Sequence, residues 1–240
     1  MLQHNPEAIV QLYLQAGRDD ARIQGLLELV NTLQLPHEIC SRQELDQKVN
    51  HAAHQGVVAL CKRIKREKDE AFLTSLLLNL DHPPFLLILD GVTDPHNLGA
   101  CLRSAEAAGV DAIIVPKDKS AMINSTVQKV ACGAAEIVPF IAVTNLARSI
   151  KALQERGIWV QGLAGEGDTS LYQADLTGPL ALVLGSEGKG LRRLTREHCD
   201  ALLSIPMAGE ISSLNVSVTA GVCLFEAVRQ RSSGKTSPVD

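Results

Sequence analysis

Three short segments combine glycines with polar side chains at spacings that could bind a ligand or support catalysis. The first runs from Asp94 to Arg103, the second from Leu184 to Gly190, and the third from Ile205 to Ser217. Glycines let a backbone approach a ligand closely, while carboxylate, amide and guanidinium groups can bind it or handle a proton. The three segments are therefore candidates for one shared site.

The first segment has the side chains of a turn that opens a helix. Asp94, Pro95 and Asn97 are typical turn and cap residues. Arg103 would lie one to two turns into the helix, on a face that could look back over the loop. A helix cap followed by an ordinary surface arginine explains the same pattern, so this segment alone leaves both interpretations open.

The second segment has three glycines in six residues and one carboxylate, Glu187. It is not a P-loop, because Lys189 is followed by Gly190 rather than by serine or threonine. It also lacks the G-x-S-x-G sequence of a hydrolase nucleophile. A loop that approaches a ligand is favoured over a plain tight turn.

In the third segment, Ser212 or Ser213 suits the N-cap of a final helix, which places Asn215 in its first turn. Ile205, Met207 and Leu214 could hold an aromatic ring, although a place in the core is the commoner role for such side chains.

Two further patterns carry less weight. Gly165-Glu-Gly-Asp168 begins like a dinucleotide-binding loop, but Ser170 replaces the third glycine and no helix pattern follows, which argues against a Rossmann-type NAD enzyme. Arg192, Arg193 and Arg196 would form one basic helical face, either solvated or phosphate-binding.

The six cysteines stand singly, without zinc-site spacing, so we expect reduced thiols and no metal.

The elements that must position these segments are those of an α/β domain. Over 83–240, apolar runs alternate with helical patterns, which predicts a mostly parallel sheet. Strands are expected at 85–90, 112–115, 136–140, 158–162, 180–184 and 201–205, and helices at 98–108, 125–131, 145–156, 191–198 and 214–229. Ligand sites in such sheets lie at loops leaving the carboxyl ends of strands, where the three segments fall.

Residues 1–61 predict a small, separate α/β domain. Apolar residues have helical spacing at Ile9, Leu12 and Tyr13 and again over 23–30, and strands are expected at His37–Cys40 and Gly56–Leu60. A charged run and the pair Pro83-Pro84 indicate a linker over 62–82, with a short helix at 70–80.

Composition limits the class of protein. The chain has 240 residues, of which 45% are hydrophobic and 21% charged, as in ordinary globular proteins. A formal charge of −4 gives no global argument for a nucleic-acid partner, and 3% aromatic residues argue against base-stacking sheets. No apolar run approaches the roughly 20 residues of a membrane span, and Met1–Val10 lacks a signal peptide. We therefore expect a cytoplasmic protein without a membrane partner.

Together the three segments resemble the motifs of the SpoU family of ribose 2′-O-methyltransferases, within the SPOUT superfamily. The shared patterns are D-P-x-N-x-G-x-x-x-R (Asp94 to Arg103), L-G-S-E-G-x-G (Leu184 to Gly190) and I-P-M-x-G-x-x-x-S-L-N-V-S (Ile205 to Ser217). Each motif is modest alone, but all three in this order are highly specific. The resemblance extends over 83–231, and residues 54–58 resemble the end of the family's N-terminal RNA-binding domain. Such family members begin with a further strand and helix, so this chain is expected to start inside that helix, with an incomplete first domain.

The resemblance implies a fold, a cofactor and partners. The fold would be a mostly parallel sheet with helices on both faces and a C-terminal deep trefoil knot, preceded by a small α/β RNA-binding domain. The cofactor would be S-adenosylmethionine, and the family is homodimeric with the site near the interface. The activity would be methylation of the ribose 2′-hydroxyl of a guanosine in 23S ribosomal RNA. A tRNA methyltransferase and a catalytically silent RNA-binding homologue remain alternatives.

The resemblance also implies residue roles. Gly185, Ile205 and Leu214 match cofactor-contacting positions, with Met207 as a neighbour, and Asn97, Arg103, Glu187, Ser213 and Asn215 match catalytic or site-organising positions. Arg103 would act as the base in the family's proposed mechanism. Because arginine has an ordinary pKa of about 12.5–13.8, it could instead stabilise the forming alkoxide or hold the adjacent phosphate.

Overall fold

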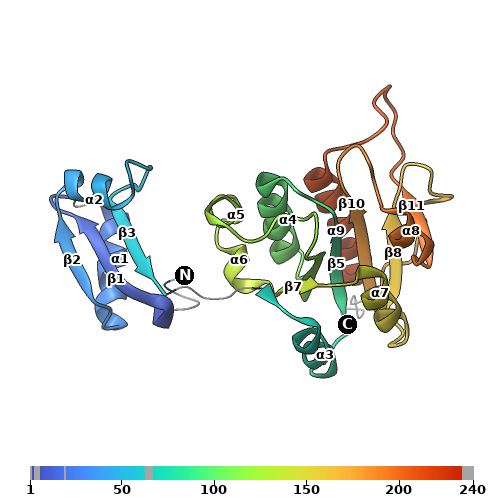
Figure 1. The fold of residues 1–240 in the computed structure, drawn as a ribbon, viewed down its shortest axis with the longest axis horizontal. Coiled ribbons are helices and arrows are strands. Elements are labelled where there is room, and N and C mark those ends of the chain that lie inside the picture. The colour runs from blue at the N-terminus through green and yellow to red at the C-terminus, as the bar shows by residue number, and fades with distance from the viewer. Residues whose placement is uncertain (1, 3–5, 19, 63–66, 234–240) are drawn as a thin grey trace, which may run out of the picture. The chain divides into compact units, whose positions relative to one another are not determined.

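The chain forms two compact units, Met1–Lys65 and Arg66–Asp240, in the computed structural model (Figure 1). The structure describes all residues except 1, 3–5, 19, 63–66 and 234–240, so part of the predicted linker and the C-terminal tail lie outside the described residues. Each unit has its own sheet and core.

The first unit is a three-stranded sheet with two helices. Its elements after a 3-10 turn (Pro6–Ala8) are β1 (Ile9–Gln15), α1 (Ala21–Thr32), β2 (His37–Cys40), α2 (Arg42–Lys48) and β3 (Val57–Cys61). The strand order is β2-β1-β3, with β2 parallel and β3 antiparallel to β1. Asp20 caps α1, and Ser41 with Glu44 forms a capping box on α2.

The helix expected around Ile9, Leu12 and Tyr13 is wrong, because these residues lie in β1. Leu12 and Leu14 alternate onto the buried face, and a window of five residues cannot separate a period of 2 from one of 3.6. The expectation that the chain starts inside the helix of a further strand–helix pair stays a prediction, because that pair would precede β1. The strand at His37–Cys40 is confirmed, and β3 differs from its prediction by one residue at each end.

The segment 67–78, predicted as part of a linker, belongs to the second unit. β4 (Glu67–Lys68) pairs with β7 (Phe140–Val143), and α3 (Glu70–Leu78) buries Leu73 in the core beneath the sheet. Asp69 caps α3 by accepting from the backbone N–H of Phe72 at 3.0 Å. The predicted short helix therefore exists, but apolar contacts attach it to the sheet.

The second unit contains an eight-stranded sheet with the order β4-β7-β6-β5-β10-β8-β11-β9, and every strand pairing within the described residues is parallel. The remaining strands are β5 (Phe85–Asp90), β6 (Ala112–Pro116), β8 (Trp159–Leu163), β9 (Thr169–Ser170), β10 (Leu180–Gly185) and β11 (Ala201–Ser204). The remaining helices are α4 (Pro95–Ala107), α5 (Ser125–Ala131), α6 (Ala134–Ile137), α7 (Leu146–Gln154), α8 (Arg193–Glu197) and α9 (Val216–Ser233). The predicted α/β class with a mostly parallel sheet is confirmed.

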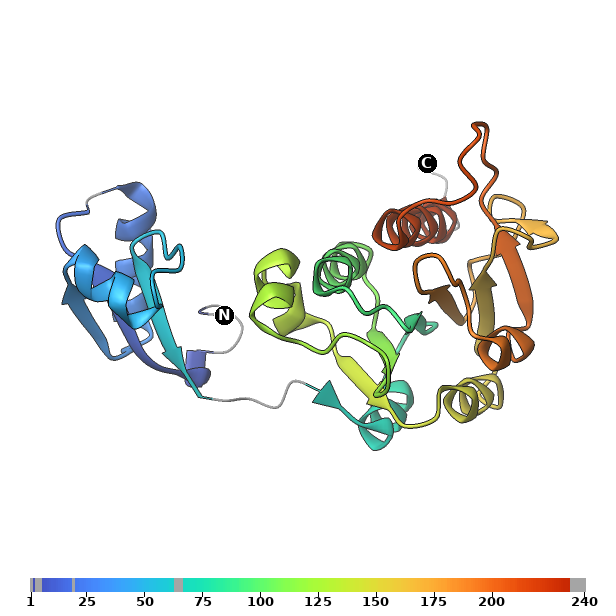
Figure 2. The same ribbon diagram turned by 45° about the horizontal axis from the view of Figure 1, so that its top comes forward.

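Helices cover both faces of this sheet (Figure 2). Alternate residues of β5 enter different cores: Leu87 packs with α4, α5, α6 and α9, while Ile88 packs with α3 and α7. Parallel strands buried on both faces must be apolar throughout, which is why β5 and β10 read as unbroken apolar runs. This arrangement leaves the loops at the carboxyl ends of the strands free to form a site.

One predicted strand, at 136–140, is displaced. Residues Ala134–Ile137 form α6 instead, and the strand β7 begins at Phe140. Gly133 adopts the left-handed conformation (φ 98°) that starts this helical turn, and Pro139 has no N–H with which to continue a helix. Ala134 and Ala135 are buried in the core shared with α4, so packing favours the helical turn.

Arg231 fastens the end of α9 to the amino-terminal edge of the sheet. Its guanidinium stacks over the Phe85 ring at 4.4 Å and donates to the carbonyls of Leu176 and Gly178 at 3.0 and 2.6 Å. Burial is the main reason that its pKa is lowered. These contacts connect three segments that are distant in sequence.

We predict that Arg231→Met lowers the free energy of unfolding by about 1–3 kcal/mol, because the carbonyls of Leu176 and Gly178 lose a charged donor. Urea unfolding followed by circular dichroism measures the change. The matched control is Arg193→Met, whose exposed pair with Glu197 contributes less than about 0.5 kcal/mol. Equal losses in the two variants would contradict the anchoring role of Arg231.

Candidate active site at the carboxyl edge of the sheet

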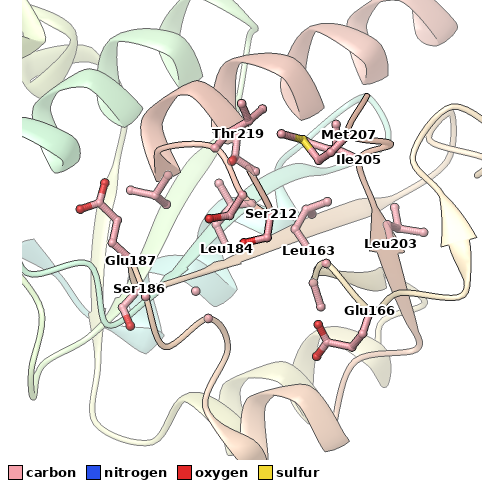
Figure 3. A pocket seen from close by; sticks show the side chains of 18 residues that line it. Leu163, Glu166, Leu184, Ser186, Glu187, Leu203, Ile205, Met207, Ser212 and Thr219 are labelled. Atoms are coloured by element: carbon pink, nitrogen blue, oxygen red, sulfur yellow. The ribbon is translucent and has the colours of Figure 1, made fainter. Parts of the chain in front are cut away.

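A cavity of about 570 Å³ lies at the carboxyl edge of the second unit's sheet (Figure 3). Loops that follow β8, β10 and β11 and the start of α9 form its walls. The lining residues are Leu163, Ala164, Gly165, Glu166, Leu184, Gly185, Ser186, Glu187, Gly188, Gly190, Leu203, Ile205, Met207, Ser212, Ser213, Leu214, Val216 and Thr219. This volume falls within the roughly 300–1,000 Å³ of small-molecule sites. We call it the first cavity.

Six of the nine site residues implied by the resemblance line the first cavity: Gly185, Glu187, Ile205, Met207, Ser213 and Leu214. Glu187 and Ser186 lie at one end of it, and Ile205, Met207 and Glu166 at the other (Figure 3). The cavity therefore offers apolar side chains over part of its wall and a carboxylate at each end.

Gly185 is required by its own loop. A Cβ at this position would collide with the backbone of Gly190 and Leu191. The chain turns back at this point because Ser186 and Gly190 exchange backbone hydrogen bonds of 3.1 and 2.9 Å, and Gly188 and Gly190 both have positive φ. The glycines thus make the loop that carries Glu187.

A second cavity of about 760 Å³ adjoins the first. It is lined by Gly91, Val92, Thr93, Asp94, Asn97, Lys119, Ser186, Glu187, Lys189, Gly190, Leu191, Arg192, Arg193 and Val216. Ser186, Glu187, Gly190 and Val216 line both cavities. Glu187 therefore stands where a ligand of one cavity would meet a ligand of the other.

Two asparagines hold the Glu187 side chain at this junction. Asn97 Nδ2 donates to Glu187 Oε1 at 2.9 Å, and Asn215 Nδ2 donates to the same oxygen and, at 3.0 Å, to Asn97 Oδ1. Asn97 is buried in the first turn of α4, whereas Glu187 and Asn215 are exposed. The structure thus brings together one residue from each sequence motif.

Asn215 also determines where α9 begins. Its Oδ1 accepts from the backbone N–H of Ser217 at 2.9 Å and from the Ser217 hydroxyl at 2.6 Å, so Asn215 occupies the N-cap position. The prediction of Ser212 or Ser213 as the N-cap is wrong. The helix starts later because Asn215 can cap it with Oδ1 while its Nδ2 binds Glu187 and Asn97.

Arg103 does not join these residues within the chain. It is exposed on α4, lines neither cavity, and donates from Nη1 to Cys132 Sγ at 3.6 Å. Six residues separate it from Asn97, which is about 240° around a helix, so the two side chains leave α4 on different sides.

The loop after β8, considered from the sequence only as a dinucleotide-binding loop and given little weight, is part of the site. Leu163, Ala164, Gly165 and Glu166 line the first cavity, although the residues that follow form β9 rather than the helix of a dinucleotide-binding fold. The available signal was a glycine-rich loop directly after a strand. Gly167 lets this loop pack on β11, since a Cβ there would lie 2.6 Å from the Leu203 carbonyl carbon.

The three arginines expected on one basic face instead pair separately with carboxylates. Arg192 Nε lies 3.3 Å from Asp90 Oδ1, Arg193 Nη1 lies 3.0 Å from Glu197 Oε1, and Arg196 pairs with Glu166. Arg192 and Arg193 line the second cavity, whereas Arg196 lies outside it.

The buried thiol of Cys101 is not suited to nucleophilic chemistry. All six cysteines are free, and burial, with a smaller contribution from Glu187, raises the pKa of Cys101 to about 12, so that this thiol stays protonated near neutral pH. Within the described ranges, no three metal-binding side chains gather, and no helix combines the length and hydropathy needed to cross a bilayer.

Comparison with known proteins adds a family context. Residues 84–225 match the SpoU rRNA Methylase family, and residues 1–66 match a family described as RNA 2′-O ribose methyltransferase substrate binding. The 23S rRNA (guanosine-2′-O-)-methyltransferase RlmB of Pectobacterium atrosepticum is 59% identical over 231 residues, covering 96% of this chain and 94% of the relative. RlmB of Escherichia coli K12 is 58% identical over 234 residues, which cover 97% of this chain and 95% of the relative.

Solved structures agree in fold. The SpoU methyltransferase AviRb from Streptomyces viridochromogenes, in complex with the cofactor AdoMet, superposes with a TM-score of 0.79 at 26% identity, over 97% of this chain and 88% of that one. The TrmH/SpoU tRNA modifying enzyme of A. aeolicus gives a TM-score of 0.59 at 29% identity, over 69% of this chain and 85% of that one.

We predict that Gly185→Ala lowers the free energy of unfolding by about 1–3 kcal/mol, because the new Cβ forces Gly190 and Leu191 away. The matched control is Gly209→Ala: Gly209 has open space around it, so the change should stay within about 0.5 kcal/mol. Thermal unfolding of both variants tests this. A Gly185→Ala protein as stable as the control would show that the loop is not closed against Gly185.

Proposed function

Since the chain belongs to the SpoU rRNA Methylase family, we propose that it transfers a methyl group from S-adenosylmethionine to the ribose 2′-hydroxyl of a guanosine in 23S ribosomal RNA. The observation that carries this proposal is the placement of Glu187 between two adjoining cavities, within a chain that is about 58% identical to RlmB proteins over nearly its full length. One cavity would hold the methyl donor and the other the acceptor.

The first cavity fits S-adenosylmethionine in size and chemistry. Ile205, Leu214 and Leu203 supply apolar surface for an aromatic ring, and Glu187, whose hydrogen-bond partners are neutral amides, supplies negative charge for the cationic sulfonium. Gly185 keeps the loop under the ligand free of side-chain atoms. Together with Met207, these residues are proposed to hold the cofactor.

When bound, S-adenosylmethionine supplies a methyl group on a sulfonium sulfur that is open to in-line attack. The Asn97–Glu187–Asn215 network then orients the acceptor ribose, because the amides fix the Glu187 carboxylate at the boundary between the cavities. Ser213, in the wall of the first cavity, would contact the donor or the ribose. The main contribution of these residues is to align the acceptor 2′-hydroxyl with the methyl group of the donor.

Arg103 is proposed to act in the site of a second copy of the chain. It lines neither cavity of its own chain, yet a guanidinium near the 2′-oxygen would stabilise the negative charge that develops there. A stripe of exposed apolar side chains on α9, with Val218 at 50% and Phe225 at 49% exposure, lies on a helix that packs directly against α4. We propose that this stripe forms a homodimer interface near the site.

The N-terminal unit is proposed to bind RNA, since residues 1–66 match a substrate-binding family.

We also propose that the C-terminal part of the chain forms the deep trefoil knot expected from the resemblance. In support, α9 follows β11 but packs on α4 and β10, on the other side of β8, so the 205–215 segment returns past β8 toward β10. A ribosomal RNA substrate would place the protein in the cytoplasm.

The direct test is transfer of tritium from labelled S-adenosylmethionine to 23S RNA by the purified chain, followed by mapping of the 2′-O-methyl mark. A mark on a guanosine of 23S RNA is expected. Methylation of tRNA alone would favour a tRNA methyltransferase, and binding of RNA without transfer would favour a silent homologue.

We predict that Arg103→Ala lowers the rate of methyl transfer by about 100-fold or more, because stabilisation of the developing charge is lost. Calorimetric titration should give an S-adenosylmethionine affinity within about threefold of the parent protein, since Arg103 lies outside the first cavity. Arg103→Lys should retain part of the activity. A parental rate for Arg103→Ala would remove Arg103 from the reaction.

We predict that the double variant Val218→Asp/Phe225→Asp is monomeric in sedimentation velocity, because it buries unpaired charges in the proposed interface. Leu78→Asp, at a site 76% exposed on α3, is the matched control and should leave the dimer intact. An intact dimer in the double variant would place the interface elsewhere.

A further inference from the structure

The second cavity carries cationic side chains that the proposed donor and catalytic residues leave unexplained. We propose that it binds the backbone phosphodiester of the RNA next to the methylated ribose, with Lys119, Lys189 and Arg192 as the binding residues. This inference rests on the proposed function, and it adds where the backbone of the acceptor RNA binds.

The charges in the cavity favour an anionic ligand. Lys119 and Lys189 are exposed, and neither has a carboxylate within salt-bridge distance among the described residues. Four cationic side chains of the lining (Lys119, Lys189, Arg192 and Arg193) outnumber its two carboxylates, Asp94 and Glu187. Asp94 caps α4 through the backbone N–H of His96, and Glu187 lies at the junction with the first cavity. Lysine side chains are suited to this role because they bind phosphates as mobile point charges.

Arg192 is held in place for such contacts by a buried carboxylate. Asp90, the last residue of β5, is fully buried; its Oδ2 accepts from the backbone N–H of Arg192 at 2.9 Å, and its Oδ1 lies 3.3 Å from Arg192 Nε. Arg192 Nη2 donates to the Asp118 carbonyl at 3.2 Å, whereas Nη1 makes no hydrogen bond to any described residue. A guanidinium fixed at one edge keeps the other available for phosphate oxygens.

Gly91 and Asp118 lie close to this arginine. A Cβ on Gly91, which has a φ of 83°, would lie 3.1 Å from Arg192 Nη2. Lys119 also has positive φ (58°), which is uncommon for a residue with a side chain, and it follows directly after the residue whose carbonyl accepts from Arg192. Three loops therefore converge on one guanidinium.

Covalent geometry explains why a phosphate must lie here. The 3′-phosphate of a nucleotide is attached to the ribose carbon next to the one that carries the 2′-hydroxyl. If that hydroxyl lies at Glu187 and the donor fills the first cavity, the phosphate lies within a few ångströms of Glu187, where the second cavity offers space for it. The shared residues Glu187 and Val216 are consistent with a ribose that spans the junction.

The test uses the full chain and a 23S RNA transcript, and measures both RNA affinity and methyl transfer. Lys119→Gln/Lys189→Gln should weaken RNA binding and raise the KM for RNA at least about tenfold, while kcat at saturating RNA and the affinity for S-adenosylmethionine stay within about twofold. The slope of log affinity against log salt should fall by about one for each lysine that no longer binds a phosphate. Lys151→Gln, an exposed lysine on α7 outside both cavities, is the matched control.

A second measurement identifies the phosphate itself. In an RNA fragment that carries the mapped position, a neutral methylphosphonate replaces the linkage 3′ to the methylated nucleotide. The parent protein should lose about tenfold in affinity, and the double lysine variant should lose little more, because the two changes remove the same interaction. Fully additive losses would overturn the proposal.

The outcomes separate this inference from the proposed function. Weaker RNA binding by the lysine variant, with no transfer by either protein, would support the phosphate site and reject the reaction. Transfer by the parent protein, with unchanged affinity and KM in the lysine variant, would support the reaction and overturn the phosphate site.

Discussion

The arrangement of this protein's site depends on one carboxylate held by two amides. Glu187 Oε1 accepts from Asn97 at the start of α4 and from Asn215 at the start of α9. Asn97 and Asn215 are 118 residues apart, and their side chains also bond each other at 3.0 Å. Asn97 lies in the first turn of α4 and Asn215 caps α9, so this small network ties two helices to the loop after β10 and sets the boundary between the two cavities.

The sheet provides the rigid frame for that network. β5 and β10 are neighbouring parallel strands in register from Leu180 opposite Phe85 to Gly185 opposite Asp90. Their carboxyl ends therefore lie side by side at the same edge of the sheet, which places Glu187 beside α4 and Arg192 over Asp90. Arg231 fixes α9 at the opposite edge of the same sheet. The loops can be shaped for binding because the strands beneath them are fully packed.

Much of the second unit could be predicted from sequence because its strands are buried on both faces. Phe85–Asp90 and Ser125–Ala131 have the predicted bounds. The failures come where local pattern is ambiguous. Ile9, Leu12 and Tyr13 fit either period over so few residues, and Ala134–Ile137 is a helical turn only because Gly133 and the adjoining core favour it.

The site shows the same division between local signal and tertiary contact. Six of the nine site residues that the motifs implied line the first cavity, since glycines and polar side chains after strands are a local signal. Asn97 lines the second cavity, and Arg103 and Asn215 line neither. The pairing of Asn215 with both Asn97 and Glu187, and the closure of Gly190 against Gly185, depend on contacts between distant segments that no spacing reveals. The positioning of Arg192 by buried Asp90 depends on a strand 102 residues earlier.

The most direct measurement of the central claim is a crystal structure of the full chain with S-adenosylmethionine. We expect the donor in the first cavity, against Ile205 and Leu214, with its methyl group toward the second cavity and the Asn97–Glu187–Asn215 network intact. A donor bound elsewhere, or one that enters the first cavity only by breaking that network, would contradict the claim.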